Sequence, residues 1–522
     1  MNLKTLISLT ITLFCLLSQH CLASSQNIQA GLCPKGLDTL PILQNGRLKP
    51  LYVHAKETFS LLGIKIKGPL TPTQTYCLLS LEGLKVPNDL NLQTPIQHIK
   101  LREFLELKDD QKTISFKSLL KKAEKLRIKL VKMKEDTSEK KAFQKVFNKV
   151  HLYNSIRTAN DWTLFDKDKK DGVTWPVLGS YLTEKRVKAT FENYPSENPI
   201  VKTILLTKTD YIQKLGDQYL VEYHFVKADL PFWCLILSLV TLASMTLFRK
   251  KVGVVLIFSS ATFLLQLAMM ILRIYISGRA PITNMYETVF FSGFGCLALG
   301  LFIGHLKKEK VFVFIGVGYN ILTLLMINFA DGMLNEQISP LVPVLRDNFW
   351  LSTHVTTIIV SYGALAMSWV LGNSILVKKC FFGITKEEEK YLSEKVYTCL
   401  KWGTILLAAG VILGGVWADY SWGRFWGWDP KETWSLIVLC IYMAILHGRS
   451  TSWIPTKRFI PLVSGAFMSV IMAWFGVNYI LASGLHSYGF SEGGAIFIGS
   501  FFAFQTIFLI FATLKTKNYD YA

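Results

Sequence analysis

Tryptophan is concentrated in one short segment of the chain. Five of the thirteen tryptophans lie there: Trp417, Trp422, Trp426, Trp428 and Trp434. Indole rings offer flat apolar area and stacking edges, so this segment could bind a large flat apolar ligand. An interfacial aromatic belt of a membrane protein would also concentrate tryptophan. The interleaved Gly423 and Gly427 favour the binding site, because they would let the backbone approach a flat ligand.

The segment Trp422–Asp429 is called the tryptophan loop below. The residues at its end predict how it is held. Asp429-Pro430-Lys431-Glu432 has the order of a helix N-cap, a proline at the first helical position and a glutamate at the third. We therefore expect a helix to begin at Pro430 and to anchor the loop.

Two histidines could supply metal ligands near the loop. His354 ends the run Trp350-Leu-Ser-Thr-His354, and His486 lies in Gly484-Leu-His486. No cysteine or carboxylate pattern accompanies them, so they fit the two axial positions of a haem better than a tetrahedral zinc site. Either histidine alone would be interpreted as an interfacial side chain bonded to water or backbone. Their placement on one membrane surface, argued below, favours the ligand interpretation.

A third histidine, His447, lies further along the helix expected after Pro430. At 1.5 Å per residue it is roughly 26 Å from that start, near the opposite face of a bilayer. Together with Arg449 it could be an interfacial anchor. It could equally be a transient ligand for a cargo that enters from the inside, because ionisable groups at membrane depth often mark pathways. Both interpretations stay open.

Composition shows which elements must position these residues. Hydrophobic residues make up 51% of the 522 and charged residues 18%, which excludes intrinsic disorder and a purely soluble fold. From residue 230 to 522 we expect an all-α polytopic membrane domain of about nine transmembrane helices. The expected spans are Leu230–Phe248, Val252–Leu272, Thr288–Gly304, Val311–Phe329, Val355–Val377, Thr404–Trp417, Pro430–Leu446, Ile460–Leu481 and Gly494–Leu514.

Charge predicts the orientation of these spans. Lysine and arginine gather in alternate connections, as the positive-inside rule requires of the cytoplasmic side. The other connections, which include Ala330–His354, Ala418–Asp429 and Ala482–Gly493, then share the outer surface. His354, His486 and the tryptophan loop are thereby expected on one face of the membrane.

The chain before residue 230 has a different character. Residues 1–23 have the layout of a secretory signal peptide, with an uncleaved anchor as the alternative. Residues 24–229 predict an exported soluble α+β domain, with a strand-like run from Tyr219 to Val226 and a basic helical stretch from Ser118 to Val150. The net charge of +20 could suggest nucleic acid, but an exported basic helix is expected to be a solvated face, and we predict no nucleic-acid partner.

Cysteine usage argues against redox chemistry. The chain has nine cysteines and no C-x-x-C, which removes the main support for a thioredoxin-like mechanism. Cys33 and Cys77 form the one plausible exported pair. They could make a disulfide or remain two small unpaired side chains, since sequence does not give the distance between them.

The motifs resemble the cytochrome c assembly family, specifically the CcsA (ResC) component of the system II cytochrome c synthetase. Trp422–Trp434 resembles that family's haem-binding WWD motif, and Pro281–Glu287 is similar to another family segment. Trp350–Tyr362 and Asn478–Gly489 resemble the segments around its external histidines, matching His354 and His486. Tyr442–Arg449 resembles its transmembrane histidine region, matching His447.

The resemblance implies a function and a location. Family members take haem b as cargo from the cytoplasmic side and hold it outside between the external histidines and the tryptophan loop. They then present it to the C-x-x-C-H motif of apocytochrome c. The implied haem-binding residues are His354, His486, Trp422, Trp426, Trp428, Asp429 and His447, with no catalytic nucleophile; Arg424 is added below on account of its charge. The implied location is a bacterial inner membrane, with the haem site and soluble domain on the periplasmic side.

The chain also departs from the family pattern. Leu40-Pro41 and Gly46–Leu51 are similar to the end of the CcsB (ResB) half of fused synthetases, so residues 24–229 resemble a CcsB remnant. The remaining CcsB spans and their transmembrane histidine have no counterpart before Leu230. The resemblance therefore implies a separate ResB-like membrane partner, besides apocytochrome c and thiol-reducing proteins.

Two functions remain open at this level. The first is a synthetase of haem lyase type, in which cysteine thiols add to the two vinyl groups of haem while the protein binds and orients both partners. The second is a haem transporter that only exports its cargo. In either case the basic residues expected outside could bind the haem propionates: Arg273, Arg279, Arg346, Arg424 and Lys431. We expect Arg424 to be the best of these, with pairing to a lipid phosphate as its alternative.

Overall fold

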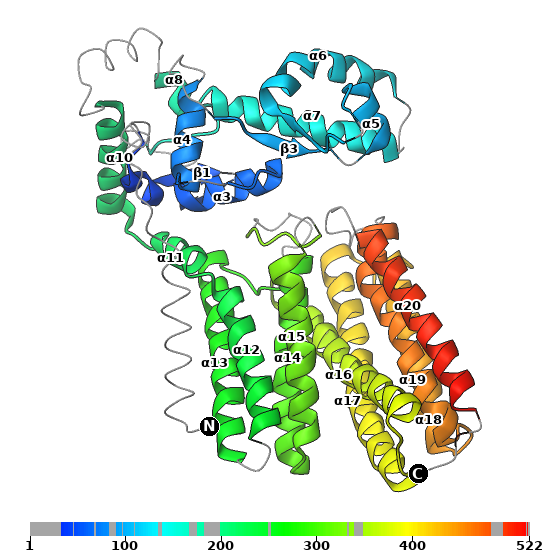
Figure 1. Ribbon diagram of the computed structural model, residues 1–522. Coiled ribbons are helices and arrows are strands. Elements are labelled where there is room, and N and C mark those ends of the chain that lie inside the picture. Colours follow the sequence, from blue (N-terminus) through cyan, green and yellow to red (C-terminus); the bar gives the residue numbers. More distant parts are fainter. Residues whose placement is uncertain are drawn as a thin grey trace. The chain divides into compact units, whose positions relative to one another are not determined.

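The computed structural model divides into two compact units, residues 1–227 and 228–522 (Figure 1). It describes residues 33–517 and 519, except 45, 67–68, 83–89, 97, 109, 134–137, 166–174, 182–198, 249–251, 331–332, 339–347 and 482–493. The expected signal peptide, together with His486 and Arg346, lies outside the described residues.

The first unit is built mainly from helices, with two small antiparallel sheets in its described part. Its elements are η1 (Lys35–Thr39), β1 (Pro41–Gln44), β2 (Arg47–Pro50), α3 (Leu51–Leu62), α4 (Pro72–Glu82), β3 (Gln93–Pro95), α5 (Ile99–Phe104), β4 (Thr113–Ser115), α6 (Phe116–Lys132), α7 (Ser138–Arg157), α8 (Leu178–Tyr181), α10 (Pro199–Leu215) and α11 (Leu220–Ala228). Strand β1 pairs with β2, and β3 pairs with β4.

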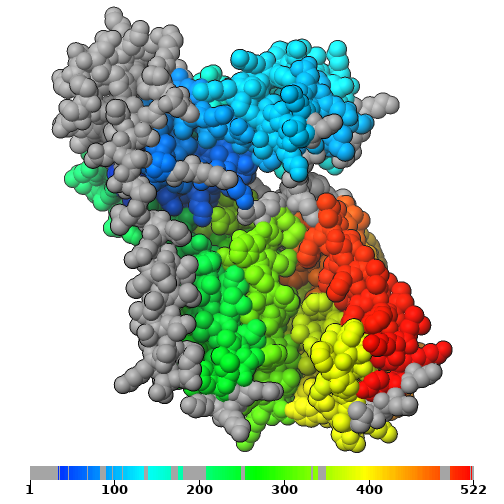
Figure 2. Space-filling view, in the orientation of Figure 1, coloured from blue at the N-terminus to red at the C-terminus, as the bar shows by residue number. Residues whose placement is uncertain are grey.

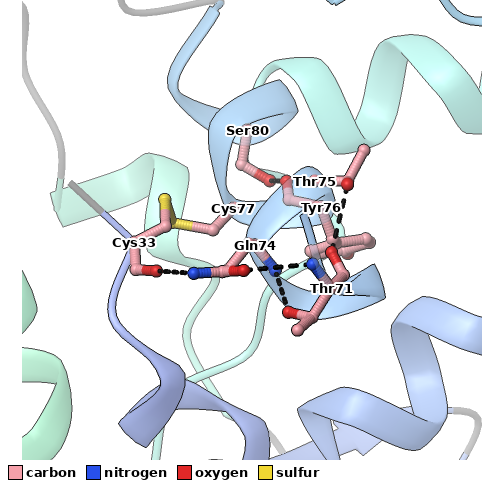
Figure 3. The surroundings of a disulfide bond; sticks show 7 residues. All are labelled: Cys33, Thr71, Gln74, Thr75, Tyr76, Cys77 and Ser80. Carbon is pink, nitrogen blue, oxygen red and sulfur yellow. Dashed lines mark hydrogen bonds between the residues drawn. A yellow bond between two sulfur atoms is a disulfide. The ribbon is translucent and has the colours of Figure 1, made fainter. Parts of the chain in front are cut away.

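A disulfide links Cys33, the first described residue of this unit, to Cys77 in α4 (Figure 3). Both cysteines are buried, with 0% and 3% of their surfaces exposed. Beside them the Gln74 side-chain amide donates to the Cys33 carbonyl at 3.3 Å. Of the two alternatives left open by the sequence, the structure contains the disulfide.

One local expectation for this unit needs correction. The run from Tyr219 to Val226, expected as a strand, lies almost wholly in helix α11. A short run of aromatic and β-branched residues cannot be told from a buried helix by its pattern alone, and here Glu222, Tyr223 and Phe225 are buried. The basic stretch from Ser118 to Val150, expected to be helical, is found in the two helices α6 and α7.

The second unit is helical throughout its described part. Its elements are α12 (Leu230–Leu247), α13 (Val252–Ser277), α14 (Met285–Lys307), α15 (Lys310–Phe329), α16 (Asn348–Phe381), α17 (Lys386–Trp422), α18 (Pro430–Ser450), α19 (Thr456–Ile471), the π-helix η3 (Met472–Leu481) and α20 (Gly494–Lys515). Among the described residues, nine helices are long and apolar enough to cross a membrane, with α19 and η3 forming one of them. This confirms the expected nine-span, all-α membrane architecture.

Two helices are much longer than the spans expected from hydropathy. Helix α16 has 34 residues and α17 has 37, so they are roughly 51 and 55 Å long. A hydrocarbon core of about 30 Å is shorter than either. His354 therefore lies within α16, and Trp417 and Trp422 lie within α17, whereas His354 and Trp422 were expected in connecting loops. Hydropathy marks only the apolar middle of a helix, which is why their polar ends were missed.

Helix α20 lies at one edge of the membrane unit (Figures 1 and 2). Only 17% of its most apolar window is buried within the chain, compared with 67% for the span formed by α19 and η3. Most of the core of the unit is formed by α14, α15, α16, α17, α18, α19 and η3. Of these, α14, α16, α17, α18 and η3 border the site described next.

Candidate functional site

A cavity opens among α14, α16, α17, the tryptophan loop, α18 and η3. Its empty volume, including the part open to its surroundings, is about 880 Å³. Its lining is mostly apolar, with a few polar groups. The lining residues are Ile282, Thr283, Asn284, Met285, Thr288, His354, Val355, Ile358, Ile359, Tyr362, Gly410, Val411, Gly414, Gly415, Phe425, Trp426, Lys431, Glu432, Ser435, Ala473, Trp474 and Asn478.

Helix α16 presents His354 to this cavity. The histidine is 8% exposed, and its Nδ1 lies 2.8 Å from the Trp350 carbonyl one turn earlier. A carbonyl only accepts, so Nδ1 carries the proton and Nε2 carries the lone pair. The ring also stacks on Trp417, with centroids 4.9 Å apart and 26° between the planes. The backbone and α17 thus fix the orientation of a basic imidazole nitrogen.

Helix α17 borders the cavity with glycines. Gly410, Gly414 and Gly415 all line it. A Cβ at Gly415 would come within 2.5 Å of the Phe425 ring, and one at Gly414 would lie 3.6 Å from Cδ2 of His354. The absence of side chains on this face lets Phe425 pack directly against α17 and brings the backbone of α17 close to the His354 ring. Sequence reasoning missed these residues, although the G-x-x-x-G-G spacing within an apolar helix could have indicated them.

The tryptophans of the loop have different surroundings. Trp426 lines the cavity together with Phe425. Trp422 packs edge-on against Trp417 with centroids 4.5 Å apart. It thereby contacts the same ring on which His354 stacks. Trp428 is 69% exposed, adopts a positive φ of 58° and does not line the cavity. Trp422, Trp426 and Trp428, which the sequence analysis grouped in one motif, therefore have three different surroundings.

The expected capping box at the start of α18 is confirmed. Oδ1 of Asp429 accepts the backbone N–H groups of Lys431 and Glu432, each at 2.9 Å. Glu432 in return accepts the N–H of Asp429 at 3.3 Å and that of Gly427 at 2.7 Å. Four hydrogen bonds therefore tie the loop to a rigid helix.

The positions of Arg424 and Lys431 relative to the cavity differ from the expectation. Arg424 does not line the cavity: its Nη1 contacts Glu432 at 3.3 Å, and its guanidinium lies over the Trp422 ring at 5.5 Å. Lys431, the second residue of α18, does line it. The expected preference for Arg424 over Lys431 is therefore not supported, because the loop uses Arg424 for its own packing.

The loop glycines have other roles than close approach to a ligand. Gly423 ends α17 in the left-handed conformation, with φ of 69°. At Gly427 a Cβ would overlap the Arg424 guanidinium. Both glycines shape the loop and do not line the cavity.

A buried ion network lies next to the part of the cavity wall that contains Thr283. Glu287 accepts from Arg273 at 2.9 Å and from Arg279 at 3.1 Å, and all three side chains are at most 7% exposed. Its Oε2 also accepts the N–H and the hydroxyl of Thr283, which lines the cavity. Arg273 and Arg279, two of the expected propionate candidates, therefore fix this wall, a role that the sequence alone did not reveal.

The π-helix η3 supplies the remaining wall. Trp474 donates to the Thr288 hydroxyl at 3.2 Å, and Asn478 donates to the Met285 sulfur at 3.2 Å. These contacts join η3 to α14 across the cavity. His486 follows eight residues after Asn478 and lies outside the described part of the chain.

His447 lies apart from this site. It is exposed in the last turn of α18 and is not among the residues that line the cavity. Helix α18 is continuous from Pro430, so His447 is roughly 26 Å along the axis from the tryptophan loop.

The sequence is similar to that of known proteins of one family. Residues 282–486 match the family described as "Cytochrome C assembly protein". "Cytochrome c biogenesis protein CcsA" of Prochlorococcus marinus (strain NATL1A) is 35% identical over 257 residues, covering 42% of this chain and 80% of the relative. The protein of the same name from Chlamydomonas reinhardtii is 32% identical over 260 residues, covering 48% and 73%. "Protein NrfI" of Wolinella succinogenes is 37% identical over 238 residues, covering 43% of this chain and 25% of that protein.

These matches fall on a multi-pass helical membrane unit with a largely apolar cavity. The chain therefore belongs to the cytochrome c assembly family, as a CcsA-family protein. Its role lies in cytochrome c biogenesis.

Proposed function

We propose that the membrane unit binds haem in this cavity and presents it for covalent attachment to apocytochrome c. The observation that carries the proposal is His354, whose Nδ1 is bound to the Trp350 carbonyl at the wall of a largely apolar cavity. This arrangement leaves the lone pair of an oriented imidazole on Nε2, as an axial haem ligand requires. Haem b is here the substrate and not a resident cofactor.

His486 is proposed as the second axial ligand. Three residues of η3 line the cavity, and the last of them, Asn478, precedes His486 by eight residues. Eight residues reach roughly 26 Å when extended, so the chain between Asn478 and His486 is long enough for the histidine to return to the site. Trp426 would then lie against the macrocycle, while Asp429 holds the loop and Trp422 supports His354 from behind.

The proposed reaction is the addition of two cysteine thiols of a C-x-x-C-H motif to the two vinyl groups of haem. In each addition an S–C bond forms, the thiol proton passes to the other vinyl carbon, and no net oxidation occurs. The described cavity offers no obvious covalent nucleophile, so its contribution is binding, orientation and exclusion of water.

The remaining elements of the proposal concern delivery. We place the haem site on the periplasmic side of a bacterial inner membrane, after export directed by residues 1–23. His447, at the other end of α18, would bind haem transiently together with a histidine of a separate ResB-like partner. The first unit would be the counterpart of the end of CcsB, and thiol-reducing proteins would keep the apocytochrome cysteines reduced.

Coexpression of the full chain with a C-x-x-C-H apocytochrome tests the proposal, with covalent haem stain as the readout. Wild type should yield holocytochrome, and His354→Ala should yield little. His305→Ala is the matched control, because His305 is exposed in the last turn of α14 and does not line the cavity. Haem bound by the chain without any covalent product, even with the ResB-like partner present, would instead indicate a haem exporter.

A further inference from the structure

A second hollow lies on the membrane unit, away from the haem cavity. It is an open groove between α15 and α16 with an empty volume of about 980 Å³, including the space open to its surroundings. Its lining is largely apolar and shares no residue with the first cavity. The lining residues are Leu322, Trp369, Val370, Asn373, Ser374, Val377, Lys378 and Phe382.

The groove follows the axis of α16. Its lining runs from Trp369 to Phe382, thirteen residues or roughly 20 Å of helix. One leaflet of a hydrocarbon core is about 15 Å deep. The groove is therefore long enough to reach from the end of α16, where the polar turn to α17 begins, to the middle of the membrane.

The polar atoms within the groove are engaged by the protein. The Ser374 hydroxyl donates to the Val370 carbonyl at 2.8 Å. The Asn373 amide donates to the Trp369 carbonyl at 3.0 Å and accepts from Gln505 at 3.0 Å. The wall is thus suited to a hydrocarbon chain and not to a ligand that needs hydrogen bonds at this depth.

Only one end of the groove carries charge among its described lining residues. Lys378 lines it there and forms an ion pair with Glu388, the third residue of α17. Both side chains are 39% exposed, so their mutual attraction is weak and leaves them able to accept other partners. A cation beside an anion at the membrane interface is complementary to a headgroup that holds both a phosphate and an ammonium.

From these observations we propose that the α15–α16 groove is a binding site for one phospholipid with an ethanolamine headgroup. An acyl chain occupies the groove between Trp369 and Phe382, the phosphate contacts Lys378, and the ammonium contacts Glu388. The bound lipid would seal the seam between α15 and α16. This inference is independent of the haem proposal, because the two hollows share no lining residue.

Native mass spectrometry of the full chain tests the site, after delipidation and addition of phosphatidylethanolamine or phosphatidylglycerol. Wild type should retain one phosphatidylethanolamine and bind phosphatidylglycerol more weakly, because Glu388 repels an anionic headgroup that has no amine. Ser374→Phe should abolish retention by filling the groove. Lys378→Gln should weaken it about tenfold, as expected for the loss of one charged hydrogen bond, whereas Lys307→Gln at the exposed end of α14 should not.

Three outcomes would overturn the proposal. The first is equal retention of both lipids by wild type, and the second is unchanged retention in Ser374→Phe. The third is cross-linking of a Ser374→Cys variant to a second protein with no lipid retained. If Ser374→Phe fails to fold, Lys378→Gln and Glu388→Gln still test the site, because both change only the exposed headgroup end.

Discussion

At the scale of single residues, the chemistry of the site depends on how each side chain is held. His354 is oriented by a backbone carbonyl and by the Trp417 ring, and Asp429 is occupied with two backbone N–H groups. Arg424 is bound to Glu432, whereas Lys431 lines the cavity. Residue type alone would not separate these roles.

His354→Ala should remove most of the haem that copurifies with the chain, because it deletes the oriented imidazole. Added imidazole should restore part of the absorption spectrum and part of the cytochrome assembly, since it can occupy the space left by the side chain. The measurement is haem content by pyridine haemochrome assay. Full haem occupancy in His354→Ala would contradict the ligand assignment.

Lys431→Gln should weaken haem binding by about 10- to 100-fold, the effect of losing a hydrogen bond to a charged group. Its effect on haem dimethyl ester should be small, because the ester has no propionate charge to contact. Arg424→Gln should reduce the binding of both ligands alike, since it acts through the shape of the loop. Titrations of both haems into the two variants check this, and an equal effect of Lys431→Gln on haem and its ester would exclude the propionate contact.

Asp429→Ala should destabilise the loop and the start of α18 by about 1 kcal/mol, the usual cost of losing an N-cap. Asp429→Asn should restore most of this, because an amide oxygen can also accept the two N–H groups. Thermal unfolding in detergent and holocytochrome yield are the readouts. An Asn variant as defective as the Ala variant would show that the carboxylate charge itself is needed.

At the scale of elements, a cavity forms where one helix face lacks side chains. Gly410, Gly414 and Gly415 leave space on α17, and η3 closes that space from the other side through Trp474 and Asn478. The network around Glu287 fixes the intervening wall. The site is therefore a product of helix packing and not of a loop alone.

A substitution series at Gly414 tests this role of α17. Gly414→Ala should be tolerated, because its Cβ would lie at ordinary contact distance, 3.6 Å, from His354. Gly414→Leu should displace the imidazole or fill the cavity and so reduce haem content several-fold. Gly499→Leu on α20 is the matched control, since nothing lies within 4 Å of a Cβ there. Equal haem content in the two leucine variants would show that the α17 face does not shape the site.

At the scale of the whole molecule, the chain combines a membrane unit with a unit that contains a disulfide. Cys33 and Cys77 are separated by 44 residues, and both are buried. Burial keeps reductants away from the sulfurs. That protection matters under the proposed function, in which the apocytochrome cysteines must be kept reduced.

The double variant Cys33→Ser/Cys77→Ser should lower the stability of the first unit by about 4 kcal/mol, as loop-closure entropy predicts for a loop of this length. Hydrogen exchange should rise in peptides from residues 33–227, while peptides from α14 to α19 stay unchanged. Haem content should also be retained. A parallel rise in exchange across the membrane helices would show that the two units fold as one.

The sequence by itself determined the membrane architecture and the family. Nine apolar runs and the motifs around His354 and Trp422–Trp434 are local patterns, and each is visible within about 20 residues. The capping box at Asp429 was predictable for the same reason. In contrast, hydropathy could not show that α16 and α17 extend beyond the membrane, because their polar ends carry no hydrophobic signal.

Only the tertiary structure decided which residues meet. Arg424 contacts Glu432 whereas Lys431 lines the cavity, although both are basic residues of one short segment. Cys33 is bonded to Cys77, which lies 44 residues later in the chain. The cavity itself is formed by residues from 282 to 478, and no local pattern contains the distance between α14 and α17. Periodicity records which face of an element is apolar, but packing alone determines what that face touches.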